Sequence, residues 1–505
     1  MDQIATNDIK RRIARDNPWW VDGNIEIPEA SLPKRVYFHS FKRLALDTAV
    51  KRAAVLLGPR RVGKTVMIKQ LVADALSHGY HAHNILYASI DAPVYSGMSL
   101  EQFIDFMPSA EGGPRIVIFD EIQYLKDWEV HLKDLVDNYV GVKFVATGSA
   151  AAALRLKSNE SGAGRFSDFM LPPLTFYEFL TFLGKDEELI RVADSNGRST
   201  YSTTNIVALN ELFLDYLNYG GYPEAVLNSS IRDNQDQFIG NDIIDKVLLK
   251  DLPNLYGIQD TQQLNRLFSF LAYNAGKEAS LENISQTSGI NKPTIKKYIE
   301  YLESAFLIIK VGTVDDNCNI GLRERNFKIY LNNPSMRSAL FSPVAPEDSE
   351  SIGYLSECAV FSQWQHSSAF RRLRYARWKG GEVDVVLLGG AKDKPVWIGE
   401  IKWSDKPIKN FGEQTKSIKH FAKKHPHIKD CFLTTKTVSG TRLIDELRVK
   451  VSPTALYCYT VGRNVTKINE FLQRQIAHAD DSIDDEEIDD DEFDDDDGEE
   501  LSEVR

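Results

Sequence analysis

Cysteine is scarce in this sequence. Its 505 residues contain only Cys318, Cys358, Cys431 and Cys458, and no two of them form a C-x-x-C pair. This scatter excludes a disulfide framework and a zinc knuckle, and it is typical of a reducing compartment. No apolar run approaches the roughly 18 residues of a membrane-spanning helix, and the N-terminal residues lack the apolar core of a signal peptide. We therefore expect a cytoplasmic protein with no membrane partner.

Length and composition predict several folded units. At 505 residues the chain is too long for a single hydrophobic core, which favours three or more units. Hydrophobic residues make up 43% and charged residues 26%, as in ordinary globular proteins. These proportions exclude wholesale disorder.

The net charge of −12 is unevenly distributed along the chain. Residues 480–505 contain 17 acidic residues and one basic residue, whereas residues 358–479 contain 22 basic and 10 acidic residues. A basic segment is thus followed directly by an acidic, low-complexity tail, which we expect to be disordered. Two interpretations of the tail stay open. It is either a solvated solubiliser or a mimic of a polyanion that competes for the basic surface beside it.

A phosphate-binding loop is predicted near the N-terminus. Short apolar runs at 53–57, 85–90, 116–119 and 143–147 alternate with helix-like segments, which indicates a parallel α/β sheet. The first run is followed by the pattern G-x-x-x-x-G-K-[ST], and a predicted helix over 66–77 comes next. The loop residues are Gly58, Pro59, Arg60, Arg61, Val62, Gly63, Lys64 and Thr65.

The residue types in this loop suit a nucleoside triphosphate. Its glycines let backbone N–H groups surround phosphates, and the start of a helix favours negative charge. Lys64 would neutralise the β and γ oxygens, and the Thr65 hydroxyl would ligate Mg²⁺. We therefore predict that these residues bind ATP with Mg²⁺.

Two further strand ends complete the predicted ATP site. Asp120 and Glu121 follow the run 116–119, so Asp120 would hold Mg²⁺ and Glu121 would polarise the attacking water. The run 143–147 leads into Thr147-Gly148-Ser149, whose hydroxyls would sense the γ-phosphate, and we include Ser149 among the nucleotide-binding residues. An ordinary glycine turn is the alternative for this last segment. The acidic pair favours hydrolysis over nucleotide storage.

A second group of charged residues lies near the C-terminus. Asp384 is followed sixteen residues later by Glu400, and Lys402 comes two residues after that, within strand-like stretches. Residues i and i+2 of a strand face the same side, so Glu400 and Lys402 should point together toward Asp384. Two carboxylates suit a hard cation such as Mg²⁺, and Lys402 would assist phosphodiester attack. Simple alternation on a half-buried strand also produces these letters, so this interpretation stays open.

Residues 280–302 predict a helix–turn–helix. The turn contains Gly289, and Asn291 is placed to cap the second helix. The predicted buried face of the second helix consists of Ile295, Tyr298, Ile299 and Leu302, and its other side carries Lys292, Lys296 and Lys297. These lysines would either contact DNA phosphates or form the solvated face of a structural helix.

The order of the motifs resembles that of a known family. Further landmarks are the Asn-Pro-Trp-Trp stretch at 17–20, the Gly164-Arg165 pair, the run LPPLTFYEFL and the run GGYPE. Together they are similar to prokaryotic AAA+-type ATPases that join a P-loop domain to a winged helix and a restriction-endonuclease-like domain of the PD-(D/E)XK type. The resemblance covers residues 17–475.

The resemblance implies an α/β fold class. It implies a P-loop parallel sheet with a helical lid, a winged helix, a second α/β restriction-endonuclease-like domain and a disordered acidic tail. The corresponding divisions are an N-terminal arm (1–34), the ATPase domain (35–182), the lid (183–260), the winged helix (261–312), the nuclease-like domain (313–478) and the tail (479–505).

The resemblance also implies roles for two residues and a function. Arg165 would complete the ATP site, and Glu357 would join Asp384 and Glu400 in holding the second metal. The implied protein is a Mg²⁺-dependent ATPase coupled to a nuclease-like domain that acts on DNA through residues 353–475 and the winged helix. It would form a homo-oligomer, and defence against foreign DNA would suit its parts. The alternative is an ATP-controlled switch or scaffold that binds DNA or protein without cleavage.

Basic runs and tryptophans in the C-terminal region add to the expected nucleic-acid surface. Arginines at 371, 372 and 374 and lysines at 423 and 424 would supply the positive field that DNA binding needs. Four tryptophans could stack on bases or pack in the core, namely Trp364, Trp378, Trp397 and Trp403.

Overall fold

The chain divides into two compact units. The structure, a computed structural model, describes residues 3–23, 25–109, 112–149, 164–195, 198–234, 236–320, 326–365, 367–389 and 394–464. The predicted acidic tail at 479–505 lies outside these residues. Unit 1 comprises Met1–Pro172, Leu249–Ile258 and Ser304–Phe306, and unit 2 comprises Pro173–Leu248, Gln259–Glu303 and Leu307–Arg505. Within the described residues, no helix has both the length and the apolar character needed to cross a bilayer.

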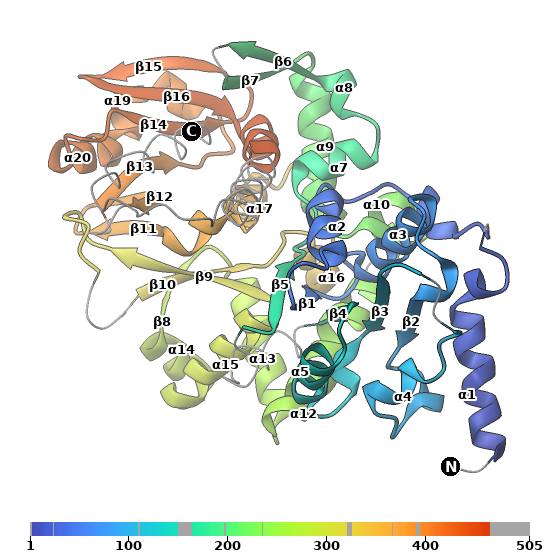
Figure 1. Cartoon of the computed structure of the whole chain (residues 1–505). Coiled ribbons are helices and arrows are strands. Elements are labelled where there is room, and N and C mark those ends of the chain that lie inside the picture. Colours follow the sequence, from blue (N-terminus) through green and yellow to red (C-terminus); the bar gives the residue numbers. More distant parts are fainter. Residues whose placement is uncertain are drawn as a thin grey trace, which may run out of the picture. The chain divides into compact units, whose positions relative to one another are not determined.

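Unit 1 contains a five-stranded parallel sheet with the strand order β2-β3-β4-β1-β5 (Figure 1). The strands are β1 (Ala53–Leu57), β2 (Ile85–Ser89), β3 (Arg115–Asp120), β4 (Val142–Gly148) and β5 (Phe166–Met170). Four of them confirm the apolar runs expected from the sequence to within one residue at each end. Because the strands are parallel, their carboxyl ends meet at one edge of the sheet.

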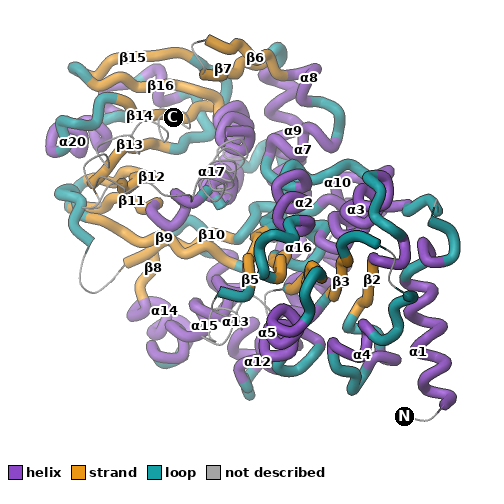
Figure 2. The backbone as a smooth tube through the Cα atoms, viewed as in Figure 1, coloured by secondary structure: helices purple, strands orange, loops and turns teal. Residues whose placement is uncertain are grey.

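Helices cover both faces of this sheet, as Figure 2 shows. One face packs against α1 (Gln3–Asp16), α4 (Leu100–Ile104) and α5 (Trp128–Asn138), whose apolar residues share a core with alternate strand residues such as Val55 and Val117. The other face packs against α2 (Phe38–Leu46), and α2 in turn contacts α3 (Lys64–Ser77). Burial on both faces explains why these strands read as continuous apolar runs.

The segment after α1 closes the open edge of the sheet. Asn17 is fully buried, and its side-chain amide donates to the carbonyls of Ile13 and Tyr87 at 2.8 Å each. Its Oδ1 accepts the backbone N–H of Tyr87 at 2.6 Å. The indoles of Trp19 and Trp20 both donate to the carbonyl of Ile85. These bonds satisfy backbone groups of the edge strand β2 that have no neighbouring strand.

We predict that Asn17→Ala destabilises unit 1. The substitution leaves the buried N–H and C=O of Tyr87 unpaired, at a cost of about 3 kcal/mol. Thermal unfolding should therefore begin about 6–12 °C earlier for a unit of this size. The control is Asn138→Ala, since Asn138 is exposed and bonds only to Asp134 one turn earlier. Equal melting curves for Asn17→Ala and the wild type would contradict the assigned role of Asn17.

The first part of unit 2 is helical but contains a β-hairpin that the sequence analysis missed. Its helices are α7 (Phe176–Phe182), α8 (Asp186–Leu189), α9 (Ile206–Tyr219), α10 (Pro223–Leu227) and α11 (Ser229–Arg232). Between α8 and α9, β6 (Ile190–Ser195) pairs with β7 (Arg198–Thr203) in antiparallel register. The helical lid expected over 183–260 therefore contains two strands as well as helices. The intervening letters Asn196-Gly197 are a strong hairpin signal, and the alternating residues on either side support it.

The chain between the helices of unit 2 and the predicted winged helix has unusual helical geometry. Two π-helical stretches, η7 (Asp236–Asp245) and η8 (Val247–Asp251), precede α12 (Leu252–Tyr256). Residues 249–258 belong to unit 1, although the chain on both sides of them belongs to unit 2. This short segment is therefore where the chain passes from unit 2 to unit 1 and back.

The helix–turn–helix is present as expected. α13 (Thr261–Tyr273) precedes α14 (Leu281–Ser288) and α15 (Lys292–Ser304), and the Asn291 side chain accepts the N–H of Thr294 at 3.0 Å. The buried residues of α15 are the four that the sequence predicted. Two of the three lysines on its other side face acids, because Lys292 pairs with Glu282 and Lys296 lies 3.9 Å from Glu300. These pairs reduce the net positive charge on that face of the helix.

A nine-stranded mixed sheet forms the rest of unit 2. Its order is β15-β16-β14-β13-β12-β11-β9-β10-β8. The strands are β8 (Glu278–Ser280), β9 (Ile308–Val314), β10 (Asn326–Leu331), β11 (Leu373–Trp378), β12 (Gly381–Gly389), β13 (Lys394–Glu400), β14 (Asp430–Thr435), β15 (Gly440–Ile444) and β16 (Leu447–Pro453). The accompanying helices are α16 (Met336–Phe341), α17 (Ser349–Trp364), α18 (Lys406–Lys409), α19 (Phe411–Gln414), α20 (Lys416–Lys424) and a helix over 454–464.

Two tryptophans of this unit belong to its core. Trp364 on α17 and Trp397 on β13 are both at most 1% exposed, and their rings lie 5.5 Å apart. Their burial removes them from the set of candidates for base stacking. Trp378 and Trp403 are only partly buried.

Candidate functional site

The loop between β1 and α3 has the backbone shape of a phosphate-binding loop. Gly63 has a φ of 93°, which L side chains rarely adopt. A Cβ on Gly58 would lie 2.2 Å from the carbonyl oxygen of Leu171, so only glycine fits there. The ammonium of Lys64 points back over the loop and donates to the carbonyls of Gly58 and Pro59 at 3.1 and 2.7 Å.

Two arginines brace this loop, one from outside it and one from within it, and the outer one was not expected from the sequence. Buried Arg35 donates to the carbonyls of Val62 and Pro172 at 2.8 and 2.9 Å. Arg60, within the loop, makes a bidentate pair with Asp251, with both nitrogen–oxygen distances at 3.1 Å. Asp251 lies in the short segment that joins the two units along the chain, some 190 residues away. No local pattern could have paired it with the loop.

Asp120 is the centre of a hydroxyl network at the carboxyl edge of the sheet. It accepts hydrogen bonds from Thr65 at 2.9 Å, from Tyr87 at 2.7 Å and from Thr147. Burial and the Asp120 charge together raise the pKa of Tyr87 far above its ordinary value, so the phenol stays a donor. The structure thus brings Thr65 and Asp120 together as predicted. The contribution of Tyr87 was not predicted, because this residue lies in the middle of the apolar run 85–90.

Glu121 and Ser149 lie beside this network. The backbone N–H of Glu121 donates to the Thr147 hydroxyl at 3.0 Å, and Glu121 has a left-handed φ of 56°. The Gln123 amide donates to the Glu121 carboxylate and accepts the backbone N–H of Ser149 at 3.2 Å. The Ser149 hydroxyl is buried and has no partner among the described residues. Gln123 therefore links the predicted catalytic acid to the predicted sensor.

The donor set of this site fits a nucleotide with Mg²⁺. Thr65 and Asp120 offer the hard oxygen atoms that Mg²⁺ prefers. Lys64 is buried with carbonyl partners alone, and burial lowers its pKa even though Glu121 and Asp120 act in the opposite direction. A bound phosphate would compensate for this desolvation. The Ser149 hydroxyl supplies a further unused polar group.

The structure does not bring Arg165 to this edge. Its backbone carbonyl accepts the N–H of Ala53 at 2.9 Å, and its side chain pairs with Asp137 at the end of α5. Arg165 thus lies at the amino end of β1, and the loop lies at the carboxyl end. Five residues of strand separate them by about 16 Å. Within its own chain, Arg165 does not complete the ATP site.

The second predicted site also assembles around neighbouring strands. Val385 pairs with Gly399 in antiparallel register, and continuing this register places Asp384 opposite Glu400. Lys402 lies two residues beyond Glu400, where its ammonium is 2.9 Å from Asp384 and 3.2 Å from Glu400. Asp384 also accepts the backbone N–H of Ile401 at 2.9 Å. The three residues are therefore in contact, as the spacing predicted.

The two carboxylates of this cluster differ in pKa. Burial and the Asp384 charge raise the pKa of Glu400 to about 8. Burial also acts to raise the pKa of Asp384, but Lys402 and Lys328 outweigh it and hold that pKa below its ordinary value. Near neutral pH the cluster therefore has one firmly ionised acid beside one that readily keeps its proton.

Glu357 on α17 joins this cluster through a lysine that the sequence analysis missed. Its carboxylate accepts the Tyr330 hydroxyl at 2.9 Å and lies 3.6 Å from the Lys328 ammonium. Lys328 is 4% exposed and also pairs with Glu382 at 2.6 Å. Burial and the Asp384 charge raise the pKa of Glu357 to about 7. No motif marks Lys328, which comes from β10, far from β12 in the sheet order.

The fit of this cluster to a hard cation is partial. Asp384 and Glu400 provide oxygen donors, and the Oε2 atom of Glu400 is buried without a partner among the described residues. The ammonium of Lys402 lies within bonding distance of both carboxylates. The described part of the chain contains no group of three His, Cys, Asp or Glu side chains arranged to hold a metal. Two acids are thus available to a metal, and Glu357 is directed toward Lys328.

Comparison with known proteins supports the first site. Residues 50–180 match a family model described as an AAA domain, and residues 210–347 match a domain of unknown function (DUF8612). An uncharacterized protein of Haemophilus influenzae is 28% identical over 293 residues, which cover 56% of this chain and 68% of the relative. Uncharacterized protein MJ1544 of Methanocaldococcus jannaschii is 22% identical over 417 residues, covering 79% of this chain and 88% of the relative.

The matches among solved structures include the Aeropyrum pernix ORC1 protein in complex with DNA. Its TM-score is 0.30 at 14% identity, and the match covers 62% of this chain and 93% of that one. A RuvB variant of Thermotoga maritima gives a TM-score of 0.27 and 15% identity, covering 55% of this chain and 89% of that one. Scores this low add nothing to the family model. Residues 50–180 thus match the AAA domain model, and the loop between β1 and α3 within them has the backbone shape of a P-loop.

Proposed function

We propose that unit 1 binds ATP with Mg²⁺ and hydrolyses it. The observation that carries this proposal is the convergence of Thr65, Asp120 and Thr147 beside the P-loop, at the carboxyl edge of the parallel sheet. Bound Mg²⁺ would be held by Thr65 and Asp120 and would neutralise charge on the phosphates. Lys64 would leave its two carbonyl partners to bind the β and γ oxygens.

Glu121 is the proposed general base. Its carboxylate lies next to the Asp120 network and is oriented by the Gln123 amide. In that position it would accept a hydrogen bond from the attacking water and polarise it. Ser149 would report the γ-phosphate to Glu121 through Gln123, since Gln123 contacts both residues.

We predict that Glu121→Gln binds ATP but hydrolyses it slowly. The amide keeps the size of the side chain but cannot act as a base, so kcat should fall about 10²–10⁴-fold. The Kd for ATP should change little, because Glu121 does not form the phosphate loop. Turnover is measured by phosphate release and binding by a fluorescent ATP analogue. The control is Glu101→Gln, since exposed Glu101 bonds only to Tyr139. A wild-type rate of ATP turnover in Glu121→Gln would show that Glu121 is not the general base.

We further propose that unit 2 acts on DNA and that ATP binding controls this action. The contacts among Asp384, Glu400 and Lys402 support a metal-dependent phosphodiesterase. Asp384 and Glu400 would hold Mg²⁺, which supplies charge neutralisation at the scissile phosphate. Lys402 would stabilise the developing negative charge. The assignments of unit 2 as restriction-endonuclease-like and of 261–312 as a winged helix are part of this proposal.

A nucleotide-controlled binder without nuclease activity is the second candidate function. The observation that favours it is Lys402, whose ammonium bridges the two carboxylates that a metal would need. Such a protein would bind DNA, or a protein partner, without breaking DNA strands. Incubation of plasmid with Mg²⁺ and ATP separates the two candidates, because only a nuclease produces nicked or linear DNA.

We also propose that the protein assembles into a homo-oligomer. Arg165 lies at the opposite end of the sheet from the P-loop of its own chain, so any role in ATP chemistry requires a neighbouring copy. Its ion pair with Asp137 is partly exposed, at 43% and 35% for the two side chains, and therefore exchanges at low cost.

A further inference from the structure

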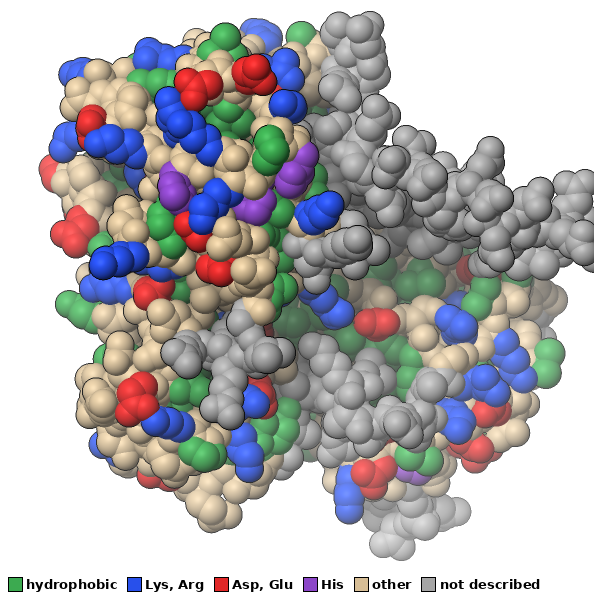
Figure 3. All heavy atoms as spheres, turned by 90° about the vertical axis from the view of Figure 1, so that its left-hand side faces the viewer, with side chains coloured by type: hydrophobic (Ala, Val, Ile, Leu, Met, Phe, Trp, Pro, Cys, Tyr) green, Lys and Arg blue, Asp and Glu red, His purple; other side chains and the backbone are tan. Residues whose placement is uncertain are grey.

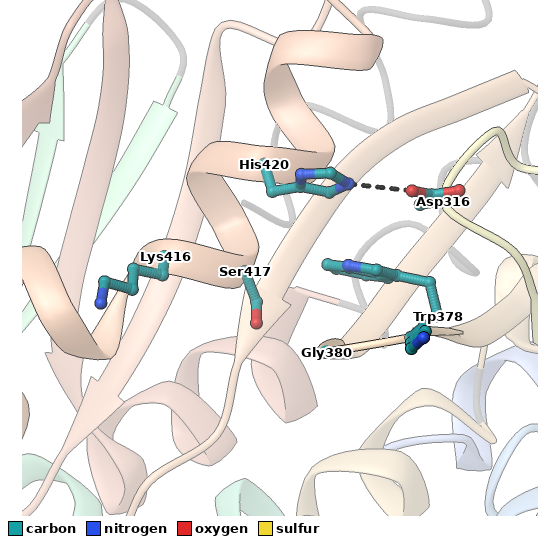
Figure 4. A pocket seen from close by; sticks show the side chains of 7 residues that line it. Asp316, Trp378, Gly380, Lys416, Ser417 and His420 are labelled. Atoms are coloured by element: carbon teal, nitrogen blue, oxygen red, sulfur yellow. Dashed lines mark hydrogen bonds and ion pairs between the residues drawn. The ribbon is translucent and has the colours of Figure 1, made fainter.

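Unit 2 contains an open pocket of about 650 Å³ on the side of the sheet covered by α20. Three segments line it: the turn after β9, the turn between β11 and β12, and the first residues of α20 (Figure 4). The side chains and backbone that form it belong to Asp316, Trp378, Lys379, Gly380, Lys416, Ser417 and His420. Of these residues, the sequence analysis named only Trp378, as one of four tryptophans that could stack on bases or pack in the core.

One wall of the pocket is rigid and aromatic. The Trp378 indole stacks on the His420 imidazole, with ring centres 5.0 Å apart and planes 20° apart, as Figure 4 shows. Asp316 fixes the imidazole through a 2.9 Å contact and is itself paired with Lys424 at 2.7 Å. A Cβ on Gly381 would approach the indole to 2.4 Å, so glycine is needed for the ring to lie there. The wall is therefore held in place without a ligand.

The other lining groups suit an anion. Lys379 is exposed, and no described acid pairs with it. Among the described residues, Lys416 pairs only with Glu413. Both side chains of that pair are nearly 70% exposed, so the pair contributes little and exchanges readily. The Ser417 hydroxyl oxygen accepts the backbone N–H of Glu382 at 3.4 Å, which leaves its proton available for donation. The acid in the pocket, Asp316, is already paired with Lys424 and bonded to the His420 ring.

The pocket lies at the same end of the sheet as the carboxylate cluster. The turn that contains Lys379 leads directly into β12, and Asp384 is the fourth residue of that strand. β13 runs antiparallel to β12 and ends at Glu400, beside the start of β12. Asp384 is thus about 15 Å along the chain from the turn. Figure 3 shows many lysine and arginine side chains on the face of the molecule that includes this region.

We propose that this pocket binds a backbone phosphate of a DNA strand, next to the site at which the strand is acted on. Lys379 and Lys416 would neutralise the phosphate, and Ser417 would donate a hydrogen bond to it. The Trp378–His420 stack would present an apolar edge to the adjoining sugar. This inference rests on the proposed action of unit 2 on DNA and names one of its contacts. Binding is measured without cleavage, so the two proposals fail separately.

The test is the salt dependence of DNA binding by the full chain carrying Lys379→Ala and Lys416→Ala together. Each phosphate that a protein neutralises contributes about 0.9 to the slope of log K against log salt. The double variant gives up one such phosphate, so it should lose about 0.9 from the slope measured with a duplex oligonucleotide and bind more weakly at low salt. The matched control replaces Lys185 and Lys246, two lysines of unit 2 that pair with neighbouring acids away from the pocket.

Two results would overturn the proposal. The first is a slope and affinity in the double variant equal to those of the wild type and of the control. The second is displacement of the oligonucleotide from wild-type protein by about 1 mM inorganic phosphate, at constant ionic strength, because the pocket would then hold free phosphate and not a strand. If Asp384→Asn loses cleavage but keeps the wild-type salt slope of DNA binding, the phosphate pocket and the carboxylate cluster act as distinct sites.

Discussion

Lys64→Ala should lower kcat/KM for ATP by at least about a hundredfold. The ammonium of Lys64 is buried in the P-loop, where it would meet the β and γ phosphates, and removing one such preorganised donor typically costs about 10²–10³ in rate. The two carbonyls that it now contacts belong to the loop itself, so the loop should keep its shape without it. The measurement is phosphate release at a series of ATP concentrations.

The matched control for this variant is Lys126→Ala, an exposed lysine of the same unit. It should turn over ATP as the wild type does and should melt at the same temperature. Turnover in Lys64→Ala within a few-fold of the wild type would mean that the loop does not hold the triphosphate.

Asp384→Asn should abolish DNA cleavage while leaving ATP turnover unchanged. The amide preserves the size of the side chain but removes the one carboxylate of the cluster whose pKa is held low, and with it a metal ligand. Loss of charge stabilisation of about 4 kcal/mol corresponds to roughly a thousandfold lower cleavage rate. The measurement is the conversion of supercoiled plasmid in the presence of Mg²⁺ and ATP.

A suitable control for this variant is Asp430→Asn. Asp430 lies on the nearby strand β14 and pairs with Arg448 away from the cluster. It should cleave plasmid as the wild type does. Cleavage that persists in Asp384→Asn would exclude this cluster as the nuclease site, and no cleavage by the wild type would favour the binding switch.

Local patterns predicted those parts of the molecule that depend on neighbouring residues. The P-loop, the four apolar strands and the buried face of α15 follow from spacing within a dozen residues, and the structure has them where they were expected. The contacts among Asp384, Glu400 and Lys402 were also expected, because strand alternation and one antiparallel pairing suffice to produce them.

Contacts between distant segments could not be predicted in this way. Asp251 reaches Arg60 and Lys328 reaches Glu357 because of the course of the chain, which no motif encodes. The position of Arg165 depends on β5 pairing beside β1, and that pairing places it away from the P-loop. The hairpin of β6 and β7 is different, since its Asn-Gly letters were available and were overlooked within a region read as helical.

The coupling between ATP binding and DNA binding is the central claim, and one comparison tests it directly. The chain carrying Glu121→Gln should bind a duplex oligonucleotide with affinities that differ at least about fivefold between ATP with Mg²⁺ and no nucleotide, the lower end of ordinary allosteric coupling. By reciprocity, the DNA should change the affinity for ATP by the same factor. Identical DNA affinities in the two conditions, with ATP shown to be bound, would contradict the claim.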